Sequence, residues 1–145
     1  KLHAVLQTLT MANYFFFYIC LIWITICVGL LSAVPNFTVS ERVGSTAVLP
    51  CELKNVHTET PYIKWSIKSK SVLEREGEDS YQGEGYKGRV DVPVEKLNKG
   101  NCSLLLENLR LNDTGVYTSF LAVTDINSGH LVPLSHVNLS VHARS

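Results

Sequence analysis

The stretch that most constrains the fold is 104–117, LLLENLRLNDTGVY. Its leucines first alternate, as residues on one face of a β-strand do, and then run into a turn made of polar residues and glycine. Tyr117 follows Gly115 by two positions and opens another apolar run that ends at Val123. The stretch therefore predicts two β-strands joined by a tight corner around Asp113.

The rest of the chain after Val34 has the same organisation. Short apolar alternations are separated by turn-rich pieces, and no helical period of useful length is present. Pro133 lies inside one expected strand and should interrupt it, because proline donates no ladder hydrogen bond. The expected strands are one around Phe37 and Val39, Ala47–Cys51, Tyr62–Ile67, a short one at Ser71–Leu73, Cys102–Leu106, Tyr117–Val123 and Leu131–Val141, with a loop at Asp125–Gly129.

The N-terminal part has a different composition. An apolar run of eighteen residues without a charge, 14–31, follows Met11 and is succeeded by the small residues Ser32 and Ala33. This build predicts a signal peptide over 11–33, with residues 1–10 as an upstream segment outside the mature protein. Because the run approaches the length of a membrane span and no Lys or Arg precedes it after Met11, an uncleaved anchor is the alternative. Either way, the domain at 34–145 is expected to be extracellular, on the cell surface or secreted.

Two spacings in the exported part are similar to those of a known family. The pattern L-x-x-x-D-x-G-x-Y, which ends at Tyr117, resembles the corner between strands E and F of immunoglobulin domains. The step of fourteen residues from Cys51 to Trp65 resembles the cysteine-to-tryptophan step of the V-set in that family. The resemblance covers roughly residues 35–142. It implies an all-β, immunoglobulin V-set-like Greek-key sandwich of about nine strands.

The resemblance also assigns structural roles, and it implies a strand at Gly88–Val90 that is similar to strand D of the family. It implies that Tyr117 bonds back across the corner, that Trp65 lies in the core, and that Arg89 pairs with Asp113, twenty-four residues further on. An arginine–carboxylate bond that closes one end of a sandwich is a structural feature and not a catalytic one.

The cysteines depart from the family pattern. The family places its second cysteine two residues after the corner tyrosine, and this chain has Ser119 there. In the family register Cys102 lies about opposite Cys51 as a non-hydrogen-bonded pair of two neighbouring strands, near the separation that a disulfide needs. We therefore expect a Cys51–Cys102 disulfide within one sheet, with two free buried thiols as the alternative. Ser119 would then lie in the core, where its hydroxyl needs a backbone acceptor.

The surface carries candidate glycans and a candidate binding patch. If Trp65 points inward, then Tyr62 and Lys64 point out of their sheet, and Phe120 points out of the same sheet if Tyr117 is buried. An exposed aromatic residue beside a cation and rimmed by polar groups is typical of a protein-binding site. A weaker candidate is the tip at 125–127. Glycosylation sequons lie at Asn36, Asn101, Asn112 and Asn138.

Several kinds of chemistry are not expected. The formal net charge is +0 and no basic stripe with interleaved aromatics occurs, which argues against nucleic acid. No nucleophile–base–acid set, phosphate loop or dinucleotide motif is present, so neither an enzyme nor a cofactor is expected. The acidic run 74–79 is expected to be a solvated loop. Four histidines lack the spacing of metal ligands, namely His57, His130, His136 and His142.

The function that the resemblance implies is binding of another protein. The family relationship points to an immune-type cell-surface receptor or ligand, similar to butyrophilin-like and related leukocyte receptors, whose partner is a protein ligand or counter-receptor on another cell. The alternatives are a homophilic or heterophilic adhesion domain and a soluble secreted modulator. Membrane association is expected only through the N-terminal segment or through a C-terminal anchor outside this sequence.

Overall fold

The computed structural model describes residues 2–31, 33–54, 61–125 and 128–144. They belong to two compact units, Lys1–Ala33 and Val34–Ser145. The first unit is one helix, α1 (Leu2–Leu31), and the described side chains of its aromatic run 14–18 are exposed. Among the described residues, no helix has both the length and the apolarity needed to cross a membrane. The signal peptide and the anchor both stay predictions.

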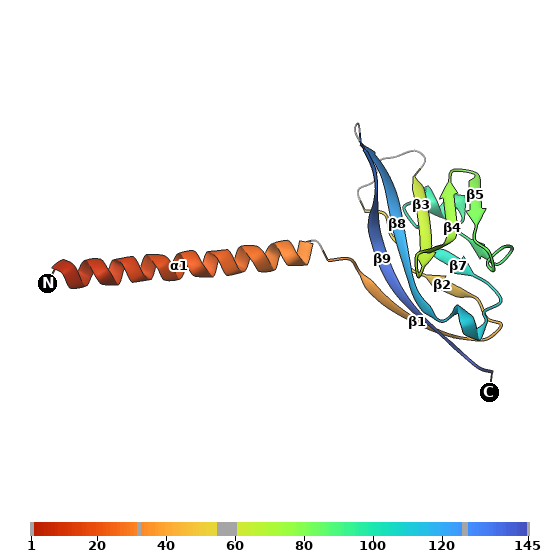
Figure 1. Cartoon of the computed structure of the whole chain (residues 1–145), viewed down its shortest axis with the longest axis horizontal. Coiled ribbons are helices and arrows are strands. Elements are labelled where there is room, and N and C mark those ends of the chain that lie inside the picture. Colours follow the sequence, from red (N-terminus) through yellow and green to blue (C-terminus); the bar gives the residue numbers. More distant parts are fainter. Residues whose placement is uncertain (1, 32, 55–60, 126–127, 145) are drawn as a thin grey trace. The chain divides into compact units, whose positions relative to one another are not determined.

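The second unit consists of two β-sheets that enclose one core (Figure 1). The larger sheet has the order β1-β9-β8-β3-β4-β5 and the smaller has the order β2-β7-β6. The predicted all-β sandwich is confirmed. Its described strands are β1 (Asn36–Arg42), β2 (Ala47–Leu49), β3 (Tyr62–Ile67), β4 (Lys70–Glu76), β5 (Asp79–Gln82), β6 (Val90–Asp91), β7 (Leu104–Leu106), β8 (Gly115–Asp125) and β9 (Ser128–His142), with short helical turns α2 (Val94–Leu97) and η1 (Leu111–Asp113).

The core follows from period-two alternation in the strands. In β3, Ile63, Trp65 and Ile67 are buried, while the residues between them are only half-buried. Residues two apart in a strand point to the same face, so one face of β3 joins the core and the other faces solvent. Burying each large apolar side chain of this kind contributes about 1.5–3 kcal/mol.

The hairpin of β8 and β9 is longer than the sequence indicated. The predicted loop Asp125–Gly129 is wrong at both ends, because β8 runs to Asp125 and β9 begins at Ser128. Residues 126–127 of the weaker binding candidate lie outside the described residues. Near Pro133 the register shifts, since Ser119 faces Ser135 and Phe120 faces Pro133. One extra residue on β9 therefore forms a β-bulge, which agrees with the expected break.

The acidic run is not a loop, contrary to the prediction. Glu74 and Glu76 belong to β4, and Asp79 begins β5. β4 pairs with β3 on one side and with β5 on the other, so its acidic residues occupy outward positions of a regular sheet. The expected short strand at Ser71–Leu73 is correspondingly extended to Lys70–Glu76.

The first and last strands of the domain lie side by side. β1 pairs with β9 in parallel, from Asn36 opposite His136 to Arg42 opposite His142. The amide of His136 also donates to the carbonyl of Pro35 at 3.0 Å. Both ends of the chain in this unit are thus held by one ladder at the edge of the larger sheet.

Candidate functional site

The corner between β7 and β8 is closed by a buried ion pair. The Arg89 guanidinium bonds to the Asp113 carboxylate through Nη2 and Oδ2, and both side chains are buried. Asp113 Oδ2 also accepts the amide of Arg110 at 2.7 Å, which fixes the start of η1. Arg89 donates further to the carbonyls of Gly85 at 2.9 Å and Asn108 at 3.2 Å. One arginine therefore ties three separate turns together.

Tyr117 bonds back across the same corner. Its hydroxyl donates to the carbonyl of Asp113 at 2.6 Å, and Tyr86 donates to the Tyr117 oxygen at 3.3 Å. Burial, followed by the hydrogen bond with Tyr86, raises the pKa of Tyr117. The tyrosine thus stays protonated and keeps its donor role.

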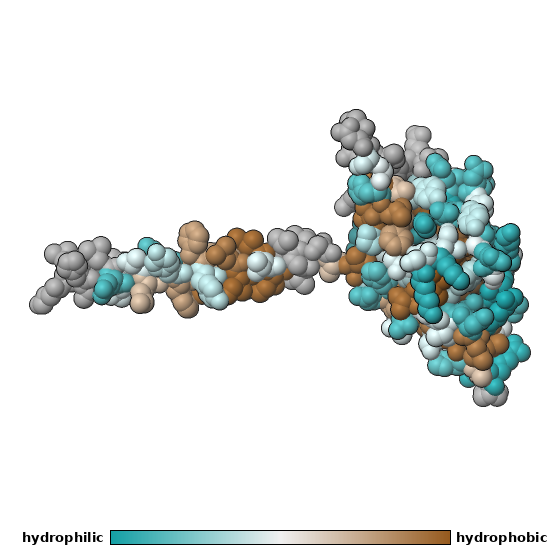
Figure 2. All heavy atoms as spheres, viewed as in Figure 1, coloured by the Kyte–Doolittle hydropathy of each residue, from teal (hydrophilic) through white to brown (hydrophobic). Residues whose placement is uncertain are grey.

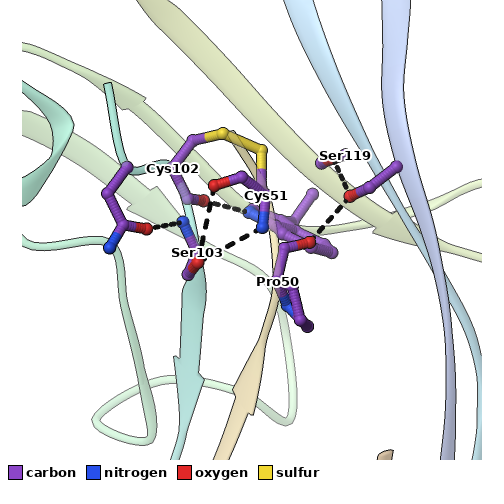
Figure 3. The surroundings of a disulfide bond; sticks show 8 residues. Pro50, Cys51, Cys102, Ser103 and Ser119 are labelled. Carbon is purple, nitrogen blue, oxygen red and sulfur yellow. Dashed lines mark hydrogen bonds between the residues drawn. A yellow bond between two sulfur atoms is a disulfide. The ribbon is translucent and has the colours of Figure 1, made fainter. Parts of the chain in front are cut away.

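The structure joins Cys51 and Cys102 by a disulfide, with 4.9 Å between their Cα atoms (Figure 3). The sequence predicts a pair without backbone hydrogen bonds between the two cysteines. This detail is wrong, because the amide of Cys102 donates to the carbonyl of Cys51 at 3.1 Å. The carbonyl of Cys102 instead accepts Nε1 of Trp65 at 3.1 Å, in the buried core. β7 therefore begins only at Leu104, two residues later than predicted, because this carbonyl bonds across to the other sheet.

Ser119 occupies the place of the family's second cysteine and is fully buried. Its hydroxyl lies 2.6 Å from that of Ser135, and Ser135 donates to the carbonyl of Pro50 at 2.9 Å (Figure 3). Since the Ser135 proton goes to Pro50, Ser119 is the donor to Ser135. The expected backbone acceptor for Ser119 is thus wrong in detail, because a second serine stands between it and the backbone. The hydrogen bond between the two serines lies within the larger sheet, and the bond from Ser135 crosses to Pro50, which directly follows β2 of the smaller sheet. This crossing stands where the immunoglobulin pattern has a disulfide.

The chain of hydrogen bonds from Ser119 through Ser135 to the carbonyl of Pro50, called the serine relay below, can be tested by mutation. Ser135→Ala leaves the Ser119 hydroxyl and the Pro50 carbonyl without this partner, so we expect the free energy of unfolding to fall by about 1–3 kcal/mol. Ser119→Ala should lower it less, because the bond from Ser135 to Pro50 survives. Urea denaturation of both single variants and the double variant measures these changes. Equal losses in the two single variants would contradict the direction of the relay.

The candidate binding residues share the outward face of the larger sheet. Lys64 lies directly opposite Phe120, and Tyr62 lies opposite Ala122, in the register of β3 and β8. All four are half-buried. On the other side of β8, Phe120 faces Pro133 of β9. Figure 2 shows hydrophobic surface over the part of the domain where β8 and β9 run and hydrophilic surface over β4 and β5.

Glu74 positions the two polar members of this patch, Tyr62 and Lys64, a role that the residue pattern alone does not indicate. Its carboxylate accepts the Tyr62 hydroxyl at 2.7 Å and lies 4.0 Å from Nζ of Lys64. The hydrogen bond to Glu74, ahead of burial, raises the pKa of Tyr62 to about 12. Cross-strand pairing of Glu74 with Lys64 is the signal that could have revealed it, once β4 was recognised as a full strand.

The asparagines of the four sequons are exposed, and the four sites are unevenly distributed over the domain. Asn36 on β1 and Asn138 on β9 share the outward face of the larger sheet with the patch, because β1 and β9 pair in parallel and His136 bonds to Thr118 of β8. Asn138 faces Val116, four residues along β8 from Phe120. At about 3.3 Å per residue this places the sequon about 13 Å from the Phe120 row.

The remaining two sequons lie elsewhere. Asn112 is in η1 at the corner, and Asn101 adjoins the disulfide in an isolated bridge with Glu52.

The match to a family model decides the classification. Residues 35–142 match the model of the immunoglobulin V-set domain, which is most of the second unit. This chain belongs to the immunoglobulin V-set family. The V-set strand order accounts for the two observed sheets, in which β3, β8 and β9 correspond to strands C, F and G.

Several relatives of this chain have names that refer to an antigen or to T-cell activation. The chain is 32% identical over 105 residues to the CD276 antigen homolog of Xenopus laevis, covering 66% of this chain and 33% of that protein. It is also 32% identical over 94 residues to the V-set domain-containing T-cell activation inhibitor 1 of Rattus norvegicus, covering 61% of this chain and 33% of that protein. The chain thus spans about a third of the length of these relatives. The human B7-H4 IgV-like domain shares the fold with a TM-score of 0.56 at 21% identity, over 72% of this chain and 91% of that one.

One further contact, which was not predicted from the sequence, joins the two V-set sheets. Arg75 of β4 is buried and bonds to Asp91 of β6 at 2.9 Å, so it links the larger sheet to the smaller one. Its second nitrogen donates to the carbonyl of Gly77 at 3.1 Å. The alternation Glu-Arg-Glu in β4 is the signal, since it places the arginine on the inner face between two outward carboxylates.

Proposed function

We propose that the V-set domain is a non-enzymatic, extracellular protein-binding module of an immune-type receptor or ligand. Its partner is a protein ligand or counter-receptor on another cell, bound through the outward face of the larger sheet. Tyr62, Lys64 and Phe120 form the centre of this binding patch. Export depends on the segment 11–33 acting as a signal peptide or as an anchor, with the domain on the cell surface or secreted.

The observation that carries the proposal is the arrangement around Phe120. An aromatic ring in the middle of a sheet face, flanked by a lysine and a tyrosine whose positions Glu74 fixes, supplies an apolar anchor with a polar rim. An open groove of about 420 Å³ adjoins it, with Lys64, Phe120 and Leu131 among its lining residues. Leu131 is 45% exposed and extends the apolar surface along β9.

The sequons support the same part of the face. Glycans at Asn36 and Asn138 would cover the side formed by β1 and the corner end of β9. The side formed by β3, β4 and the hairpin end of β8 contains none of the four sequons. A protein partner would therefore meet bare protein surface at Phe120 and glycan at Val116.

Staining of cells with the multimerised domain tests the proposal. Fluorescent tetramers of the domain are applied to leukocyte populations, with and without prior protease treatment of the cells. Phe120→Asp should reduce staining at least tenfold, because it removes the apolar anchor from the centre of the patch and places a carboxylate opposite Lys64. Val116→Asp is the matched control, since this residue is on the same strand and face and is 53% exposed.

The outcomes separate the alternatives. Protease-sensitive staining that is lost with Phe120→Asp and kept with Val116→Asp supports the proposal. Equal staining by both variants would refute the assignment of the face. Self-association of the domain in solution, abolished by Phe120→Asp, would favour an adhesion function instead.

A further inference from the structure

The sequon Asn101-Cys102-Ser103 is built into the pairing of two strands around the disulfide. The Ser103 hydroxyl accepts the amide of Cys51 at 3.2 Å and donates to the carbonyl of Cys51 at 3.5 Å. Oδ1 of Asn101 accepts the amide of Ser103 at 3.0 Å. Figure 3 shows these contacts beside the sulfur–sulfur bond. Both side chains that define the sequon are therefore engaged in the folded protein.

The backbone on either side is fixed as well. The amide of Asn101 donates to the carbonyl of Lys96 at 2.9 Å, and the amide of Leu53 donates to the carbonyl of Gly100 at 2.8 Å. Asn101 also forms a bridge with Glu52. The sequon thus cannot be drawn out as an extended segment while the bond between Cys51 and Cys102 is closed.

We propose that closure of the Cys51–Cys102 disulfide ends glycan transfer to Asn101, so that the occupancy of this sequon records which of the two reactions came first. The inference rests on the proposed export of the domain. It concerns Asn101 alone, because the sequons at Asn36, Asn112 and Asn138 contain no cysteine.

The two competing reactions are distinct. In glycan transfer, Nδ2 of Asn101 forms a bond to C1 of the first sugar of a lipid-pyrophosphate-linked oligosaccharide. The bond from C1 to the phosphate oxygen breaks, the lipid pyrophosphate leaves, and the amide loses one proton. In disulfide closure, the thiols of Cys51 and Cys102 lose two electrons and two protons to a protein disulfide, which becomes a dithiol. Each reaction uses a different atom of the same three-residue sequon, and the second one immobilises the Ser103 hydroxyl that the sequon requires.

Disulfide closure blocks later glycan transfer, whereas glycan transfer does not block later disulfide closure. The Asn101 side chain is exposed, so a glycan attached first is compatible with the folded domain. A disulfide formed first removes the accessible sequon. Delaying closure should therefore raise the occupancy at Asn101, and it should leave the occupancy at the distant Asn112 unchanged.

Site-resolved mass spectrometry tests this. The chain is expressed from Met11 in mammalian secretory cells, and cell and medium fractions are pooled so that misfolded molecules are counted. Enzymatic deglycosylation in heavy-oxygen water marks each asparagine that carried a glycan. Cys51→Ser keeps the sequon intact and prevents closure, so Asn101 occupancy should rise several-fold. Dithiothreitol during synthesis should give the same rise in the wild type and no further rise in Cys51→Ser.

The control is Ser119→Ala, which perturbs the core and leaves both thiols in place. An equal rise at Asn101 in Ser119→Ala would overturn the inference, because slow folding in general would then explain the effect. Unchanged Asn101 occupancy in Cys51→Ser would also overturn it. If Asn112 is glycosylated in these cases, only this inference fails. If none of the four sequons is glycosylated, the proposed export fails with it.

Discussion

Replacing Asp113 with alanine is expected to lower the free energy of unfolding by about 3–5 kcal/mol, because it leaves a buried guanidinium without its counter-charge. Arg89 and Asp113 are 8% and 4% exposed, so water cannot replace the lost carboxylate. The substitution also removes the acceptor for the amide of Arg110. Denaturation of the isolated unit in guanidinium chloride, followed by tryptophan fluorescence, measures the change.

Two further variants make this result interpretable. Asp79→Ala removes an exposed carboxylate from β5, and its effect should stay within about 0.5 kcal/mol. Arg89→Met combined with Asp113→Leu removes both charges and should destabilise less than Asp113→Ala alone, since no charge is then left unpaired. Solvent-exposed ion pairs contribute less than about 1 kcal/mol. A loss below about 1 kcal/mol in Asp113→Ala would therefore contradict the prediction and show that water reaches the ion pair.

The paired substitution Cys51→Ala with Cys102→Ala is expected to destabilise the domain by about 4 kcal/mol, because the bond closes a long loop. The two cysteines are 51 residues apart, and the chain-entropy model relates stabilisation to the logarithm of that length. Trp65 is a suitable probe, since it is buried and bonds to the carbonyl of Cys102. Guanidinium denaturation with and without a reductant measures the loss.

The reductant supplies the internal control. Under reducing conditions the wild type should unfold at nearly the same denaturant concentration as the double variant, which should itself be insensitive to the reductant. A double variant with the midpoint of the oxidised wild type would show that the disulfide contributes no stability. It would then leave the serine relay and the two ion pairs as the main constraints on the sheets.

The sequence predicted the parts of the fold that depend on local spacing. The corner around Asp113 is encoded within nine residues, and the step from Cys51 to Trp65 spans two strands with one connection. Alternation then assigned the faces of β3 and β8 correctly, since a strand has only two faces. These signals need no knowledge of distant partners.

The parts that were missed depend on contacts between distant strands. Ser119 and Ser135 meet only because a bulge in β9 adjusts the register by one residue, which spacing alone does not reveal. Arg75 reaches Asp91 across two different sheets. Glu74 lies opposite Lys64 only because β4 extends beyond the predicted short strand at Ser71–Leu73. The choice of partner in each case is set by tertiary packing.

The parallel pairing of β1 with β9 determines how the domain would respond to mechanical load. Because the two strands run in the same direction, the chain enters the ladder at Asn36 and leaves it at His142, at the opposite end. A pull on the chain before Asn36 against the chain after His142 would slide the two strands along each other. All the bonds of the ladder would then be strained together, whereas an antiparallel pair of terminal strands would open one bond at a time.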